Sequence, residues 1–155
     1  MRYSMICAAA LLGGSLIGGS AQSAEIKAHA FDEKSNSTVI GLELDANEAV
    51  AAADIVLDLG KLPKGSVDTT QCLSELPAGF ASGCRFDGQF LRVIVGSVDG
   101  ESVIPHGLLG TVEIKSAVGS MNVVSANSFR LDGSSAGSSA GRDIGDRGID
   151  SQQVQ

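Results

Sequence analysis

Cys72 and Cys84 are the residues of this chain whose type and spacing most directly suggest covalent chemistry. In an exported protein an even number of cysteines indicates a disulfide, and a bond between these two would close the segment CLSELPAGFASGC. The chain-entropy model gives such a cross-link about 3 kcal/mol of stabilisation. A metal pair and two free thiols are the alternatives, although two cysteines make a poor zinc site. We predict a structural disulfide, and we assign the third cysteine, Cys7, to an N-terminal leader.

Two histidines are the candidate general bases. His29 lies in EIKAHAF, where a position on the surface of a strand is expected, and His106 lies in a connection. Neither is accompanied by a serine or cysteine nucleophile with a supporting motif. The sequence therefore predicts that the protein is not an enzyme.

Oxygen-bearing side chains gather in two turn segments. DANE contains Asp45, Asn47 and Glu48, and VDGE contains Asp99 and Glu101. Calcium binds six to eight oxygens, but no fixed-spacing calcium loop is present in either segment. Ordinary turn chemistry is the favoured explanation, so we predict no cofactor and no metal, with calcium as the alternative.

The two ends of the chain differ in composition from its middle. Residues 1–24 combine Arg2, an apolar run and small residues, which is typical of a secretory signal peptide cleaved after Ser23 or Ala24. A retained membrane anchor is the rival interpretation, but the run is short for a span. Residues 134–155, rich in Gly, Ser and Ala, are predicted to be a disordered tail. One domain, 25–133, remains between them.

Charge narrows the class of partner. The net charge is −7, and it becomes more negative when a leader carrying Arg2 is removed. Nucleic acid and anionic membranes attract basic proteins, so both are excluded as expected partners. We expect the mature protein to be secreted or periplasmic.

Alternating side chains predict several half-buried strands in this domain. In STVIGLELD, DIVLDLG and GTVEIK, branched residues alternate with polar ones. FDGQF holds the pair Asp87-Gly88, which favours a tight hairpin. Short strands separated by turns predict an all-β fold of two packed sheets. The residues expected in its core are Ile40, Leu42, Leu44, Ile55, Leu57, Leu59, Val93, Val95, Val112, Ile114, Val123 and Phe129.

Four motifs in order resemble those of cohesin domains, which belong to the carbohydrate-binding-domain superfamily. They are TVIGLELDAN, AVAAADIVLDL, GQFLRVIVGS and HGLLGTVEIK, followed by the ending NSFRLDGSS. The resemblance spans about 37–133 and implies a two-sheet β-sandwich of jelly-roll-like, cohesin-like topology. It also implies that the stretch after RVIV crosses between the two sheets. Gly107 and Gly110 would then permit a close approach to the neighbouring sheet.

The chain departs from the cohesin pattern in three respects. The disulfide predicted in the segment from Gly60 to Cys84 is absent from most cohesins, and LDLGKLP stands where a Y-D-P type of turn is usual. The sequence also contains a single copy of the motifs, where scaffold proteins carry repeats. The end of the chain, DIGDRGIDSQQVQ, only weakly resembles a dockerin calcium loop.

The resemblance implies a non-catalytic module that binds an exported protein partner, possibly of the dockerin kind. Interface anchors favour Trp, Tyr and Arg, and we consider Arg85 and Arg92. The predicted binding residues are Arg92, Glu113 and Lys115, expected on one sheet face. A polysaccharide-binding module is a second hypothesis, disfavoured because the chain has no Trp, one Tyr in the leader, and phenylalanines that are expected mostly in the core. A matrix protein without a discrete site is the third.

Overall fold

Eight antiparallel β-strands form the regular structure of the residues that the computed structural model describes, 24–34 and 36–142. No helix occurs in this range, and so none that could cross a membrane. The strands are β1 (Glu25–Lys34), β2 (Ser37–Asp45), β3 (Ala52–Asp58), β4 (Phe80–Phe86), β5 (Phe90–Ser97), β6 (Gly107–Ile114), β7 (Asn122–Phe129) and β8 (Ser135–Arg142).

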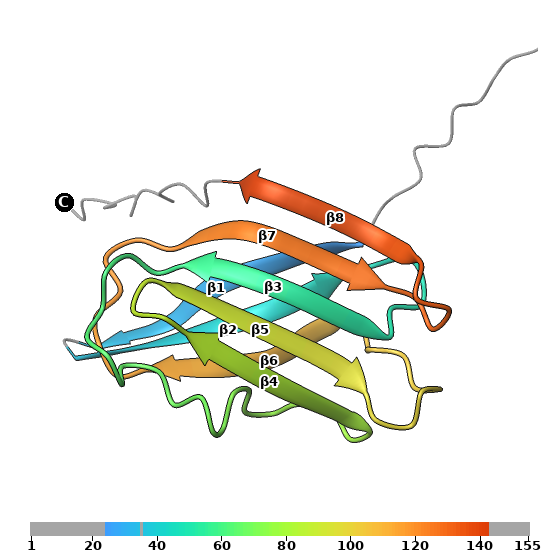
Figure 1. Ribbon diagram of the computed structural model, residues 1–155, viewed down its shortest axis with the longest axis horizontal. Coiled ribbons are helices and arrows are strands. Elements are labelled where there is room, and N and C mark those ends of the chain that lie inside the picture. The colour runs from blue at the N-terminus through green and yellow to red at the C-terminus, as the bar shows by residue number, and fades with distance from the viewer. Residues whose placement is uncertain (1–23, 35, 143–155) are drawn as a thin grey trace, which may run out of the picture.

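The strands divide into two sheets that pack face to face (Figure 1). One sheet has the order β1-β2-β6, and the other has the order β4-β5-β3-β7-β8. All pairings are antiparallel. The β5–β6 connection passes from the larger sheet to the smaller one, as the resemblance implied. The predicted two-layer sandwich is confirmed.

The core consists of the inward-facing residues that alternation predicted. Ile40, Leu42 and Leu44 are at most 2% exposed, and Ile55, Leu57 and Leu59 at most 1%. Between them the polar residues of the same strands face outward, as a sheet packed on one face requires. Phe129 differs from the prediction: it is half-buried, and its neighbour Ser128 takes the inward position at 1% exposure. The register shift earlier in β7, between Val123 and Ser125, explains this difference, because it reverses which residues of the strand point inward.

The long connection between β3 and β4 closes one side of the sandwich. It runs along the free edge of β6, where Ser74 and Thr111 exchange backbone hydrogen bonds of 2.9 and 3.0 Å. The same connection is tied to β4 by the disulfide between Cys72 and Cys84, whose Cα atoms are 5.3 Å apart. The predicted disulfide is therefore present, and it links the segment bordering the small sheet to the edge of the large sheet.

The segment from 134 to 155 was predicted to be disordered, and for residues 135–142 that prediction is wrong. These residues form β8, which pairs with β7 along six residue pairs. Pairing between backbones needs no apolar side chains, so a Ser-, Ala- and Gly-rich strand can form where β7 offers an open edge. Residues 143–155, including the dockerin-like segment, lie outside the described residues.

Ala24, the last residue of the predicted leader 1–24, contacts strand β8, which favours the predicted cleavage after Ser23 over that after Ala24. Ala24 is 5% exposed, and its backbone N–H donates to the Ala136 carbonyl at 3.2 Å. It packs so closely that a Cβ on Gly137 would lie 2.2 Å from the Ala24 carbonyl oxygen. Ala24 thus belongs to the folded domain. Residues 1–23 lie outside the described part of the chain.

Candidate functional site

The exposed side of the large sheet, which we call the five-strand face, carries an unusual share of apolar side chains. Register places Phe90, Arg92 and Ile94 of β5 on this side, because Leu91, Val93 and Val95 between them are fully buried. Phe90 is 38% exposed and Ile94 is 48% exposed. Large apolar side chains left exposed together often mark an interaction surface.

An ion pair lies in the middle of the five-strand face. The Arg92 guanidinium donates two hydrogen bonds to the Asp54 carboxylate, from Nε to Oδ1 at 2.9 Å and from Nη2 to Oδ2 at 2.5 Å. Val56 of β3 stands directly opposite Arg92 in the register. The hydrogen bonds from Arg92 hold the pKa of Asp54 below its usual value, against the opposing effect of burial. The pair is therefore fully charged at neutral pH.

Arg85 lies at the rim of the same face. It is exposed on β4 and stands directly opposite Arg92 in the β4–β5 register. No carboxylate among the described residues forms an ion pair with it, whereas Arg92 has Asp54. Arg85 also carries a long apolar stem that can pack on a partner. Of the two arginines, Arg85 is the one whose charge stays available.

The outer side of the small sheet, the three-strand face, is mostly polar and internally paired, although Leu108 of β6 is 42% exposed. Lys27 Nζ lies 3.1 Å from Asp45 Oδ2, and His29 Nε2 lies 3.3 Å from Glu43 Oε2. Glu113 is also exposed on this face. Interspersed charges of both signs are typical of a solvated surface rather than an interface core.

The three predicted binding residues do not share a face. Arg92 lies on β5 in the large sheet, whereas Glu113 and Lys115 lie on β6 and just beyond it, against the small sheet. The prediction of a common face is wrong because all three stretches alternate alike and sequence does not reveal which sheet each strand joins. Ile94 is the exposed residue that the sequence analysis missed, and Arg85 was considered there as an anchor but was not included among the predicted binding residues. Alternation around Val93 and Val95 was the signal that could have placed Ile94 outside.

Three of the four acidic residues considered for calcium, Asp45, Glu48 and Asp99, are engaged with protein groups. Glu48 forms an ion pair with Arg130, and Asp45 binds Lys27 and lies 3.8 Å from His106 Nδ1. Asp99 accepts hydrogen bonds from Ser97 and Ser102, which is turn chemistry. Across the described residues, no three His, Cys, Asp or Glu side chains come together in a group that could hold a metal.

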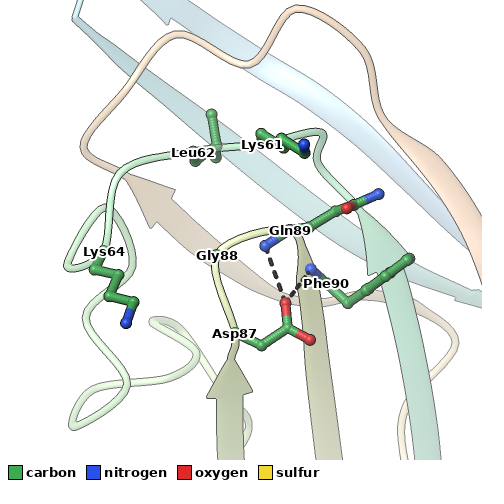
Figure 2. A pocket seen from close by; sticks show the side chains of 7 residues that line it. All are labelled: Lys61, Leu62, Lys64, Asp87, Gly88, Gln89 and Phe90. Carbon is green, nitrogen blue, oxygen red and sulfur yellow. Dashed lines mark hydrogen bonds between the residues drawn. The ribbon is translucent and has the colours of Figure 1, made fainter.

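A hollow of about 500 Å³ lies at one end of the five-strand face. It is bordered by the connection after β3 and by the tip of the β4–β5 hairpin (Figure 2). Phe90 lines it, so this phenylalanine is not a core residue as expected. The hairpin is tight, as FDGQF predicted: Asp87 N–H donates to the Phe90 carbonyl, and Gly88 has a φ of 106°.

Known structures share this arrangement of two sheets. A cohesin module of a family 33 glycoside hydrolase from Clostridium perfringens superposes with a TM-score of 0.51 at 14% identity, covering 76% of this chain and 93% of that one. A type II cohesin-X-dockerin complex from Acetivibrio cellulolyticus contains a chain that matches with a TM-score of 0.53 at 9% identity, covering 72% and 90%. The fold is cohesin-like.

A third cohesin-like match is the second type II cohesin module of the adaptor scaffoldin from the same Acetivibrio species. It aligns with a TM-score of 0.54 at 10% identity, covering 74% of this chain and 83% of that one. No protein-family model matches the sequence, and no curated protein matches it. At such low identities the likeness establishes the cohesin-like fold, while binding specificity must be argued from this chain's own residues.

Proposed function

We propose that this protein is an exported, non-catalytic module that binds a protein partner on the five-strand face. The observation that carries the proposal is the exposure of Ile94 and Phe90 beside the Arg92–Asp54 pair, on a face that alternation would otherwise fill with polar residues. Burying these apolar side chains against a partner would release about 25 cal/mol for each Å² removed from water.

Similarity to cohesins supports a partner of the dockerin kind. One of the matching structures is a type II cohesin in complex with an X–dockerin pair. The sandwich of this chain presents a broad, flat sheet face of the sort on which another folded domain can rest. We therefore propose a folded, dockerin-like protein rather than an extended peptide as the partner.

Arg85 and Ile94 are the proposed anchors. Arginine is enriched among residues that dominate binding energy, and Arg85 is exposed without a carboxylate partner among the described residues. Tryptophan is absent from the chain and its single tyrosine is Tyr3, so the strongest anchor types are missing from this face. We accordingly expect a dissociation constant near 1 μM, about −8 kcal/mol.

The disulfide supports the proposed export, and the positions of the cysteines and histidines support the proposed lack of catalysis. A disulfide such as Cys72–Cys84 persists in oxidising compartments, which favours the periplasm or the medium over the cytoplasm. With both of these cysteines bonded, neither offers a thiolate nucleophile. The imidazoles of His29 and His106 lie near the carboxylates of Glu43 and Asp45 on the three-strand face, away from Ile94 and Arg85.

The test uses the protein without its leader as bait for exported proteins of the cells that make it, followed by titration of the captured partner in purified form. Ile94→Asp and Arg85→Glu should each weaken saturable 1:1 binding at least tenfold. Lys115→Glu, which makes an equivalent change beside the small sheet, should leave the affinity within twofold. A partner that still binds the Ile94→Asp protein normally would place the interface elsewhere. Absence of any saturable partner would favour a matrix protein without a discrete site.

A further inference from the structure

The hollow at the hairpin tip has a composition different from the rest of the five-strand face. Lys61, Leu62 and Lys64 line it from the connection after β3, and Asp87, Gln89 and Phe90 line it from the hairpin. Its volume of about 500 Å³ falls within the range of small-molecule sites. It thus combines cationic donors, a carboxylate acceptor, an amide and an aromatic ring within one small area.

Backbone hydrogen bonds hold the two walls of the hollow together. The Leu62 N–H donates to the Gly88 carbonyl at 2.8 Å, and the Leu59 N–H donates to the Gln89 carbonyl at 3.0 Å. The connection is thereby fixed against the hairpin tip on both sides of Lys61. A site held this way needs little ordering when a ligand binds.

The polar groups of the hollow are oriented before any ligand arrives. Asp87 Oδ1 accepts backbone hydrogen bonds from Phe90 at 2.8 Å and Gln89 at 3.0 Å, as Figure 2 shows. These bonds, with that from Phe90 the stronger, lower the pKa of the Asp87 carboxyl, so it remains an acceptor at neutral pH. The Gln89 amide nitrogen lies 3.3 Å from each carboxylate oxygen of Asp58, which directs the side chain across the strand end.

Phe90 supplies an apolar surface beside these polar groups. At 38% exposure it is the most accessible aromatic ring among the residues whose side chains are described, since Phe80, Phe86 and Phe129 are half-buried. Figure 2 shows the side chains of Phe90 and Gln89 pointing to the same side of the hairpin tip. An aromatic ring next to amide and carboxylate groups is what recognises the C–H face and the hydroxyls of a sugar ring.

The lysines add a requirement for negative charge. Lys61 and Lys64 are both exposed, and neither forms an ion pair with another described residue. They line the hollow from two positions of the connection after β3, on either side of Leu62 in the sequence (Figure 2). A ligand with acidic groups on successive units can therefore pair one carboxylate with each lysine.

We propose that this hollow binds an acidic oligosaccharide, with a uronic acid ring packed on Phe90 beside Gln89 and carboxylates of successive sugars paired with Lys61 and Lys64. Hydroxyl groups of the sugar donate to Asp87. This site shares Phe90 with the five-strand face but contains neither of the protein-binding anchors Arg85 and Ile94, and it does not depend on the proposed protein partner. The polysaccharide-binding hypothesis was disfavoured because the chain has no tryptophan. In this hollow, the exposed ring of Phe90 takes the place of a tryptophan as the surface on which a sugar packs.

The experiment is calorimetric titration of the protein without its leader with trigalacturonate and with the same trisaccharide after reduction of its carboxylates to alcohols. We expect saturable 1:1 binding of the acidic form and at least tenfold weaker binding of the reduced form. Phe90→Ala and the double variant Lys61→Ala/Lys64→Ala should each lower the affinity for the acidic trisaccharide at least tenfold. Lys115→Ala, which removes an exposed lysine that does not line the hollow, should change the affinity less than twofold.

Three results would overturn the proposal. They are no saturable binding of trigalacturonate, equal binding of the acidic and reduced trisaccharides, and displacement by sulfate at equal concentration of charge, which would indicate a simple anion site. All variants change exposed side chains, and their melting temperatures serve as the check on folding. The Ile94→Asp variant should retain saccharide binding while losing the protein partner, so failure of one proposal is separable from failure of the other.

Discussion

Arg92 and Asp54 form a two-bond ion pair across the adjacent strands β5 and β3, on the exposed side of the large sheet. The pair lies diagonally, since Arg92 stands opposite Val56 and Asp54 stands opposite Ile94. It fixes the arginine side chain along the sheet instead of leaving it free in solvent. A surface with its central charge fixed in this way is preorganised for docking, while Arg85 at the rim stays free to adapt.

A double-mutant cycle over Arg92→Ala and Asp54→Ala should give a small coupling energy. Exposed ion pairs typically contribute about 0.2–1 kcal/mol, and the Arg92 side chain is 54% exposed, so we expect a value in that range. Urea unfolding of the four proteins provides the measurement. A coupling well above this range would mean that the pair is shielded from solvent more than its exposure indicates.

Removing the disulfide should destabilise the domain without changing its fold. The Cys72–Cys84 bond restrains the connection that runs along β6, and the chain-entropy model gives a loss of about 3 kcal/mol for a loop of this size. The variant Cys72→Ala/Cys84→Ala, compared with the parent protein in urea, measures the loss. Reductant should lower the stability of the parent and leave the double variant unchanged; an effect on both would point to a cause other than this bond.

The sequence predicted those parts of the sandwich in which side-chain chemistry alternates. Ile40, Leu42 and Leu44 are buried because apolar residues at every second position of a strand all point to one side, and that side is removed from water when the two sheets pack together. Strand β8 was not predictable by this criterion, since its residues, SAGSSAGR, have no apolar alternation. What holds β8 is backbone pairing with β7 and the contact of Ala24 with Gly137, and both are tertiary features.

The candidate site could be predicted only in part for the same reason. Arg92 was identified correctly as an exposed residue of a strand, but Glu113 was placed on the same face although β6 belongs to the other sheet. The alternation of side chains predicts which residues of a strand point into the core and which point to solvent. It does not predict which of the two sheets, and therefore which outer face, the strand belongs to. The exposure of Phe90 was missed because an aromatic at a strand start was expected inside.

Stability should fall in acid partly through Asp99. Its carboxylate accepts hydrogen bonds from the Ser102 and Ser97 hydroxyls and from the backbone N–H groups of Glu101 and Ser102, which lower its pKa below the ordinary value. A group whose pKa is lower in the folded state contributes stability above its unfolded pKa, near 3.9, and loses it as the pH falls further.

The unfolding free energy of the parent protein should therefore decline more steeply below about pH 4 than that of Asp99→Asn, which has no carboxyl group to protonate there. Urea unfolding at a series of pH values from 5 to 2 measures both curves. Parallel curves would show that the Asp99 hydrogen bonds are already broken in solution or contribute nothing to folding.

Gly110 should tolerate no side chain, because the connection between β3 and β4 packs directly against it. A Cβ at this position would lie 2.9 Å from the Ser74 carbonyl oxygen and 3.2 Å from the Leu73 Cβ, and the backbone φ is +157°, which L-residues rarely adopt. The nearest obstacle is backbone, and Ser74 is held by two hydrogen bonds to Thr111, so it cannot move aside cheaply. Gly110→Ala should cost about 1–3 kcal/mol in unfolding free energy.

Gly96→Ala is the matched control, since a Cβ there meets nothing within 4 Å and the backbone is not left-handed. If both variants unfold at the same urea concentration, the connection does not pack along β6 in solution as it does in this structure, and the closure of that side of the sandwich must be revised.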